Sequence, residues 1–293
     1  METGTPTAKP TSPQAAIDQI VRQVSEVSTL PQVALKVMRV ARDPNAGAAE
    51  LKAVVEGDPA LGMRVLKMVN SAAYGLRTTI TNLHQAISYL GFNQVRNLAM
   101  TASVADIFKR NEKVGTYQRT MLWRHLVSVG IGARLVARRC RLAAFEDAFL
   151  AGLLHDIGIV LADQHAHAQF REVIAALDGS LPLCEVERKR LGFDHCMLGA
   201  AVADAWRFPA PIRAAIRFHH GAQRYREAGS EIVRCTEVAN VICTLKGITS
   251  VGQRLVEPAL DTFKAMGFRK EDVVILAADL DREIAMSENL FEL

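Results

Sequence analysis

Apolar residues recur every three or four positions along nearly the whole chain from residue 15 onward, which is the spacing of one face of an α-helix. Leu61, Val65 and Met68 form one such face, and Asp58-Pro59 just before it is a typical helix start. The first 110 residues show no clear alternation of the kind that strands produce. The sequence therefore predicts an all-α fold.

Composition and polar, helix-breaking stretches divide this helical chain into four segments. Residues 1–14 are rich in Thr, Pro and Ser without periodicity, which predicts a disordered tail. Residues 15–113 predict an N-terminal helical bundle of five or six helices, and the polar run at 110–116 predicts the domain boundary. Residues 114–250 predict a second helical domain, and residues 251–293 predict C-terminal helices that pack on it.

Helix limits can be placed from capping residues and from the extent of each apolar face. For the second half of the chain we expect helices over 117–140, from about 145 through the motif at 150–160, and over 166–177, 183–190, 195–206, 209–220, 230–245, 251–266 and 270–288.

Composition excludes several classes of protein. A chain of 293 residues with 49% hydrophobic and 23% charged residues can bury a sizeable core. We find no signal peptide and no run of about 18 apolar residues, so no membrane partner is expected. The five cysteines form no CxxC pair, which argues against a disulfide framework or a zinc ribbon. A reducing, cytoplasmic location is the expectation.

The charges are unevenly spread although the formal net charge is only +4. Residues 110–141 hold eight Lys or Arg and one acid, whereas residues 271–293 hold seven acids and one base. Such runs could attract phosphates, but solvated helix faces explain them more often. The basic run lacks the interleaved aromatic residues that single-strand binding needs. We therefore expect no nucleic-acid partner.

His155 and Asp156 stand side by side in the apolar segment LAGLLHDIGIV at 150–160. A neutral imidazole and an ionised carboxylate are good ligands for a borderline divalent metal. Adjacent side chains on a helix diverge by about 100°, so a shared ion would lie over the seam between them. An isolated pair of this kind is more often a hydrogen-bonded core histidine beside a capping carboxylate.

The positions of the other histidines change that balance. Five of the eight histidines fall on apolar helix faces, and these are His125, His155, His195, His219 and His220. Five buried imidazoles from four helices are hard to satisfy except by one another, by Asp156 or by a metal ion. The pattern predicts a shared polar or metal site. His84, His165 and His167 do not fit it, and the last two are expected at the surface.

Several motifs carry a resemblance to a known family. They are LPQVALKVMRVARDP (30–44), EGDPALGMRVLKMVNSAAYG (56–75), AISYLGFNQVRNLAM (86–100), LWRHL (122–126), FLAGLLHDIG (149–158), LGFDHCMLGAAVADAWRFP (191–209) and IRFHHG (216–221). Over roughly residues 28–222 the chain resembles the HDOD family, relatives of the HD-domain metal-dependent phosphohydrolases. The resemblance implies an N-terminal helical bundle packed on an HD-like helical bundle. It also implies a role in bacterial signalling, where the family often stands beside receiver or cyclic di-GMP domains.

The related HD-GYP phosphodiesterases hold two or three iron or manganese ions, and their motif is matched only in part. His125 matches the early metal-binding His, His155 and Asp156 match the name-giving pair, and the later histidines match His195, His219 and His220. Three positions depart from the motif. Met121 stands in place of an acid, Ile159 in place of a Lys and Asn240 in place of a late metal-binding Asp. No Gly-Tyr-Pro motif follows His220.

These departures bear on the activity. Fewer carboxylates hold a pair of divalent ions less well, and the missing Lys removes a cation that could stabilise developing phosphate charge. The resemblance thus implies a regulatory module with a degenerate metal site, more binding protein than enzyme, whose partner is a signalling protein or a nucleotide.

The alternative is a metal-dependent phosphohydrolase of nucleotides or cyclic dinucleotides. It would use one or two iron or manganese ions, and Arg124 and Arg217 would contact phosphate. The sequence leaves the oligomeric state open.

Overall fold

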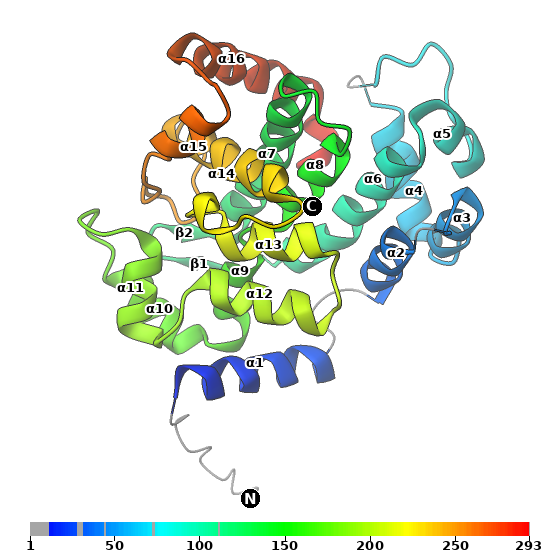
Figure 1. Cartoon of the computed structure of the whole chain (residues 1–293). Helices are drawn as coiled ribbons and strands as arrows, with labels where there is room; N and C mark the ends of the chain where they lie inside the picture. The colour runs from blue at the N-terminus through cyan, green and yellow to red at the C-terminus, as the bar shows by residue number, and fades with distance from the viewer. Residues whose placement is uncertain (1–11, 28–31, 44, 72–73, 111, 293) are drawn as a thin grey trace, which may run out of the picture.

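The computed structural model describes residues 12–27, 32–43, 45–71, 74–110 and 112–292, and within them the predicted all-α fold is confirmed (Figure 1). Of the disordered tail predicted for 1–14, residues 1–11 lie outside the described residues, and the prediction is wrong for Pro13 and Gln14, which form the start of helix α1 (Pro13–Val27). Among the described helices, none has the length and apolar character needed to cross a bilayer.

The N-terminal bundle is built from short amphipathic helices. They are α2 (Gln32–Arg42), α3 (Ala48–Glu56), α4 (Pro59–Val69), α5 (Leu83–Leu90) and α6 (Phe92–Val104), followed by the 3₁₀ helix η2 (Ala105–Phe108). Side chains of Val37, Leu51 and Leu61 are fully buried between them. The predicted start of α4 is present: the Asp58 carboxylate caps it by accepting a hydrogen bond from the Leu61 N–H at 3.0 Å.

The second bundle is centred on the longest helix, α7 (Arg119–Arg139), which packs against α8 (Phe145–Leu154) and α14 (Ser230–Leu245). Around these lie α9 (Ile157–His165), α10 (His167–Ala175), α11 (Leu183–Leu191), α12 (His195–Ala205), α13 (Ala210–Phe218) and η3 (Ala222–Arg224). The chain ends with α15 (Leu260–Ala265), α16 (Lys270–Met286) and η4 (Glu288–Leu290).

A buried polar contact joins the two bundles where α6 meets α8. The Asn97 side-chain amide donates to the Glu146 carbonyl and carboxylate at 2.7 and 2.8 Å. Arg96 pairs with Asp147 at 2.8 Å. Because Asn97 and Arg96 are buried, these bonds fix how the bundles meet.

In three places a hairpin, a turn or irregular chain replaces part of a predicted helix. A two-residue hairpin, β1 (Lys113–Val114) and β2 (Tyr117–Gln118), delays the start of α7 to Arg119, because Gly115 turns the chain at φ 54°. The helix expected through 150–160 ends at Leu154 and restarts at Ile157. Of the helix expected over 251–266 only α15 forms, since Gly252 lies in the left-handed region and against the Thr116 carbonyl.

Helix α1 (Pro13–Val27) lies along α12 and also contacts α9 (Figure 1). Its Ile17 and Ile20 side chains are buried. The sequence groups residues 15–27 with the N-terminal bundle, whereas the structure packs them on the second bundle. An amphipathic stripe shows that a helix buries one face, but it does not say against which neighbour.

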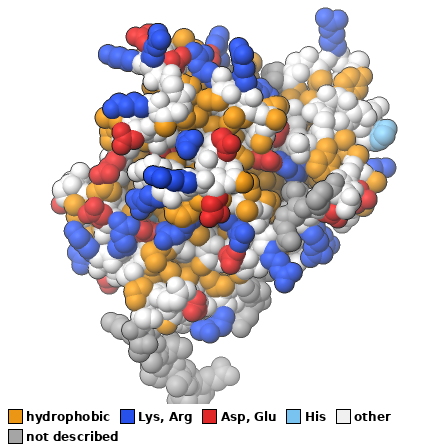
Figure 2. Space-filling model, in the orientation of Figure 1, with side chains coloured by type: hydrophobic (Ala, Val, Ile, Leu, Met, Phe, Trp, Pro, Cys, Tyr) orange, Lys and Arg blue, Asp and Glu red, His pale blue; other side chains and the backbone are white. Residues whose placement is uncertain are grey.

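The acidic C-terminal helix α16 covers the basic helix α7. Arg139 pairs with Asp272, and Arg134 approaches Glu283 at 3.5 Å. The oppositely charged runs in the sequence therefore partly neutralise each other. Figure 2 shows Lys and Arg interspersed with Asp and Glu on the visible face.

Candidate metal centre

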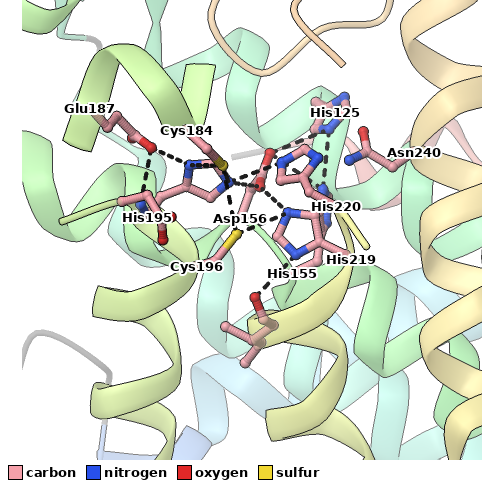
Figure 3. Close-up of polar contacts among 12 residues, drawn as sticks. His125, His155, Asp156, Cys184, Glu187, His195, Cys196, His219, His220 and Asn240 are labelled. Atoms are coloured by element: carbon pink, nitrogen blue, oxygen red, sulfur yellow. Dashed lines mark hydrogen bonds and ion pairs between the residues drawn. The ribbon is translucent and has the colours of Figure 1, made fainter. Parts of the chain in front are cut away.

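All six residues predicted for the site come together in the second bundle (Figure 3). His125 lies in the middle of α7, and His155 and Asp156 occupy the break between α8 and α9. His195 is the first residue of α12, and His219 and His220 follow α13. The break at 155–156 lets adjacent residues face one centre, which a continuous helix would not allow.

Two glycines allow the helices to approach closely enough to form the cluster. A Cβ on Gly152 would lie 2.6 Å from the Val129 carbonyl oxygen, so α8 rests directly on α7. A Cβ on Gly158 would lie 2.0 Å from the His195 carbonyl oxygen, so α9 rests directly on the start of α12. These contacts place His155 beside His125, and Asp156 beside His195.

Asp156 lies at the centre of the cluster. Its Oδ1 is 3.2 Å from His195 Nε2 and 3.1 Å from His219 Nε2, and its Oδ2 is 3.3 Å from His155 Nε2 and 3.5 Å from His125 Nε2. Burial alone would raise the pKa of Asp156, but His155 and His195 hold it well below its ordinary value. Within the described residues, Oδ1 has no partner that meets hydrogen-bond geometry despite these short distances.

Hydrogen bonds at Nδ1 fix the orientation of four of the imidazoles. The Nδ1 atom of His125 is 2.8 Å from the Ile248 carbonyl oxygen, and the Nδ1 atom of His155 is 2.7 Å from the Gly152 carbonyl oxygen. That of His219 reaches the Ala215 carbonyl at 3.1 Å, and that of His195 reaches the Glu187 carboxylate at 2.6 Å. Because a carbonyl or carboxylate oxygen can only accept, each Nδ1 carries the proton, and in the neutral ring each Nε2 presents a lone pair to the cluster.

The Nε2 lone pairs of His125 and His155 therefore face each other at 3.3 Å. The Nε2 atoms of His195 and His220 are 3.2 Å apart, and although burial alone would lower the pKa of His195, Cys196 and Glu187 beside it raise that pKa well above its ordinary value. Burial lowers the pKa of His125 to about 4 and that of His219 to about 3, which keeps both rings neutral. A divalent cation satisfies converging imidazole lone pairs and a carboxylate, so the donors present fit a metal ion.

The described side chains form three overlapping groups of metal-type donors. They are His125 with His155 and Asp156; Asp156 with His195, His219 and His220; and Cys184 with His195, Cys196 and His220. Sequence reasoning missed Cys184, Cys196 and Glu187. The available signals were the Cys next to His195 and the Cys and Glu three residues apart, which share one face of a helix.

The positions that depart from the HD-GYP pattern lie as follows. Asn240 is buried on α14 near His125 (Figure 3), and its Nδ2 has no hydrogen-bond partner among the described residues. Ile159 is buried in the core, whereas Met121 is 38% exposed. None of these three brings a charge to the centre.

A pocket of about 520 Å³ opens beside the cluster. His219, His220, Cys184 and Cys196 line it, so it reaches the centre from one side. Arg217 also lines this pocket.

The remaining residues of interest lie elsewhere. Arg124 does not line the pocket and stacks on the Phe291 ring at 5.4 Å. His84 and His167 are exposed and His165 is half-buried.

Comparison with known proteins places this arrangement in a family. The HDOD domain model matches residues 27–222. An uncharacterized protein of Treponema pallidum (strain Nichols) is 23% identical over 224 residues, which cover 76% of this chain and 43% of the relative. The chain thus spans less than half the length of that curated relative.

Solved structures share the fold. An HDOD domain protein of unknown function from Geobacter sulfurreducens is similar with a TM-score of 0.76 at 24% identity, covering 95% of this chain and 98% of the other. A candidate signal transduction protein from Marinobacter aquaeolei VT8 is similar with a TM-score of 0.76 at 22% identity. The similarity covers 99% of this chain and 68% of the other. A candidate metal-dependent phosphohydrolase from Shewanella amazonensis SB2B is similar with a TM-score of 0.61 at 20% identity. The similarity covers 96% of this chain and 99% of the other.

The helical order, the His-Asp break and the histidines gathered around it agree with the match over residues 27–222, and the chain belongs to the HDOD family.

Proposed function

We propose that this chain is a regulatory module of bacterial signal transduction, in which a buried metal-binding centre supports a ligand pocket and does not hydrolyse phosphoesters. The observation that carries this proposal is the burial of the donors His125, His155 and Asp156, which do not line the pocket and are 1%, 0% and 2% exposed. Structural metal sites are closed by protein ligands, whereas catalytic sites keep a position open for water and substrate.

The charge of the centre supports the same proposal. Among the described donors of the three groups, Asp156 is the one carboxylate, and Glu187 is engaged with His195 Nδ1. Asn240 brings no charge. Two-metal hydrolysis needs ligands that hold two dications about 3.5–4 Å apart, and a mostly imidazole set neutralises them poorly.

The pocket supplies a place for a ligand. Arg217 is exposed and lines it, and among the described residues no carboxylate lies within ion-pair distance of its guanidinium. A guanidinium of this kind suits a phosphate group. Glu257 and Asp261 also line the pocket and would accept hydrogen bonds from a base or a ribose. A nucleotide or cyclic dinucleotide is the ligand class that fits both kinds of group.

Calorimetric titration of the full chain with cyclic di-GMP and with a nucleoside triphosphate tests this proposal. We expect binding without turnover, and Arg217→Gln should weaken it about tenfold, the loss of one charge-assisted contact. Arg124→Gln is the matched control, since Arg124 is exposed but lies outside the pocket. Equal effects of the two substitutions, or no binding, would contradict the assignment of the pocket.

A phosphohydrolase is the second candidate, because the pocket reaches His219 and His220. It predicts hydrolysis of bis(4-nitrophenyl) phosphate or a cyclic dinucleotide with added manganese or iron, and loss of that activity in Asp156→Asn. Such turnover would overturn the regulatory proposal.

A further inference from the structure

Two cysteines complete a second donor set on the pocket side of the centre (Figure 3). Cys184 comes from α11, and Cys196 follows His195 at the start of α12. Their Sγ atoms are 4.0 Å apart, and Cys184 Sγ is 4.0 Å from His195 Nε2. His220 Nε2 lies 3.2 Å from His195 Nε2. One donor atom from each of the four residues lies within 4.8 Å of every other.

These separations match the edges of a zinc tetrahedron. With Zn–N near 2.05 Å and Zn–S near 2.3 Å, a regular tetrahedron puts two nitrogens about 3.3 Å apart, two sulfurs about 3.8 Å apart and a mixed pair about 3.6 Å apart. The structure has 3.2 Å for the nitrogen pair, 4.0 Å for the sulfur pair and 4.0 Å for the mixed pair of Cys184 and His195, and the donor atoms of the other mixed pairs lie within 4.8 Å of each other. Side-chain shifts of up to about 1 Å would bring the four atoms onto one ion.

We propose that Cys184, Cys196, His195 and His220 form a thiolate site that binds one zinc ion. Two sulfurs and two imidazole nitrogens in tetrahedral order select zinc over manganese and magnesium, which prefer oxygen ligands. The site shares none of its four ligands with the group of His125, His155 and Asp156, and it shares His195 and His220 with the group of Asp156, His195, His219 and His220.

The surroundings favour a bound dication at this position. Cys196 and His195 are buried, and two thiolates brought together there need a balancing positive charge. Glu187 holds the His195 ring through Nδ1, an outer contact typical of zinc-bound histidine.

The route for the metal is also present. Cys184 and His220 are only partly buried, and both line the pocket together with Cys196. Zinc can therefore enter from the pocket without opening of the helical core. A disulfide between the same cysteines would need the sulfurs to close from 4.0 Å to about 2.05 Å.

Cobalt(II) is the probe, because it replaces zinc in tetrahedral sites and absorbs light. We would strip the reduced full chain with a chelator and titrate it with cobalt under nitrogen. The expected result is a sulfur-to-cobalt charge-transfer band and intense visible bands that saturate at one equivalent and vanish when zinc is added.

The variants locate the site. Cys184→Ser and Cys196→Ser should each remove a large part of the charge-transfer band. Each should also weaken zinc binding by more than about a hundredfold, which is the upper effect of changing a residue that only hydrogen-bonds a metal ligand. Cys140→Ser is the control, as another half-buried cysteine outside the cluster. His220→Asn gives a second test if a cysteine variant fails to fold, which circular dichroism would reveal.

Three results would overturn the thiolate site. They are cobalt bound without a charge-transfer band, a band that persists in both cysteine variants, and a Cys184–Cys196 disulfide in protein purified without reductant. His155→Ala should leave the band in place, so failure of the His125–His155–Asp156 centre can be told apart from failure of the zinc site.

Discussion

His125 Nε2 and His155 Nε2 face each other at 3.3 Å, although both rings have already donated Nδ1–H to a backbone carbonyl. When neutral, two rings held in this way present lone pairs to each other, next to the carboxylate of Asp156. A cation between them removes the repulsion. This relationship makes a metal ion a better account of the cluster than a set of satisfied core histidines.

The close approach of α9 and α12 gives the first prediction. Gly158→Ala puts a methyl group 2.0 Å from the His195 carbonyl oxygen, and backbone atoms cannot yield cheaply. We expect a loss of about 3 kcal/mol or more in the free energy of unfolding. Urea unfolding measures it. Gly62→Ala is the control, because its Cβ meets its nearest atom at 3.7 Å and Ala favours a helix by about 1 kcal/mol. Equal stability of the two variants would be inconsistent with this role.

The buried ion pair of Arg119 and Asp163, beneath the hairpin, gives the second prediction. The Asp163 carboxylate accepts hydrogen bonds from Arg119 Nε at 2.8 Å and from the Tyr117 hydroxyl at 3.1 Å. Its side chain is 0% exposed. Asp163→Asn should cost about 3–5 kcal/mol, because Arg119 is left as an uncompensated buried charge.

The exposed pair of Asp281 with Lys246 is the comparison for that experiment. Asp281→Asn should change stability by less than about 1 kcal/mol. Thermal unfolding of both variants measures the difference, and a similar small loss in both would show that the Arg119–Asp163 pair does not anchor the hairpin.

The hydrogen bond between His195 Nδ1 and the Glu187 carboxylate gives the third prediction. Glu187→Gln removes the carboxylate that fixes the His195 ring, and we expect zinc affinity to fall about tenfold to a hundredfold. Competition with a chelator of known affinity measures the change. Glu185→Gln, on the same helix, should have little effect. An unchanged affinity in Glu187→Gln would mean that His195 does not ligate the metal.

Much of the fold was predictable, because apolar spacing and capping residues act locally. The start of α4 at Asp58-Pro59 is an example. The hairpin at 113–118 was not, because it depends on Gly115 and on burial of Tyr117 against Asp163, a contact 46 residues away in sequence. The partner of α1 was also missed, since an amphipathic face does not identify its neighbour.

The gathering of the histidines was predictable because each shares a helix face with core residues. The turn at 155–156 was not predicted, although it is what points both side chains at one centre. Cys184 and Cys196 were passed over because they lie 12 residues apart without a metal-binding spacing. The packing of α11 on α12, which no local pattern encodes, brings them together.

The metal content of the purified protein tests the central claim most directly. The chain should be prepared without a metal-affinity column and measured by inductively coupled plasma mass spectrometry, beside the double variant His155→Ala with Asp156→Ala. We predict at least one divalent ion per chain in the natural sequence besides the zinc ion held by Cys184 and Cys196, and loss of that ion, with the zinc retained, in the double variant. A well-folded natural protein that contains no metal and takes none up from added zinc, iron or manganese would contradict the account.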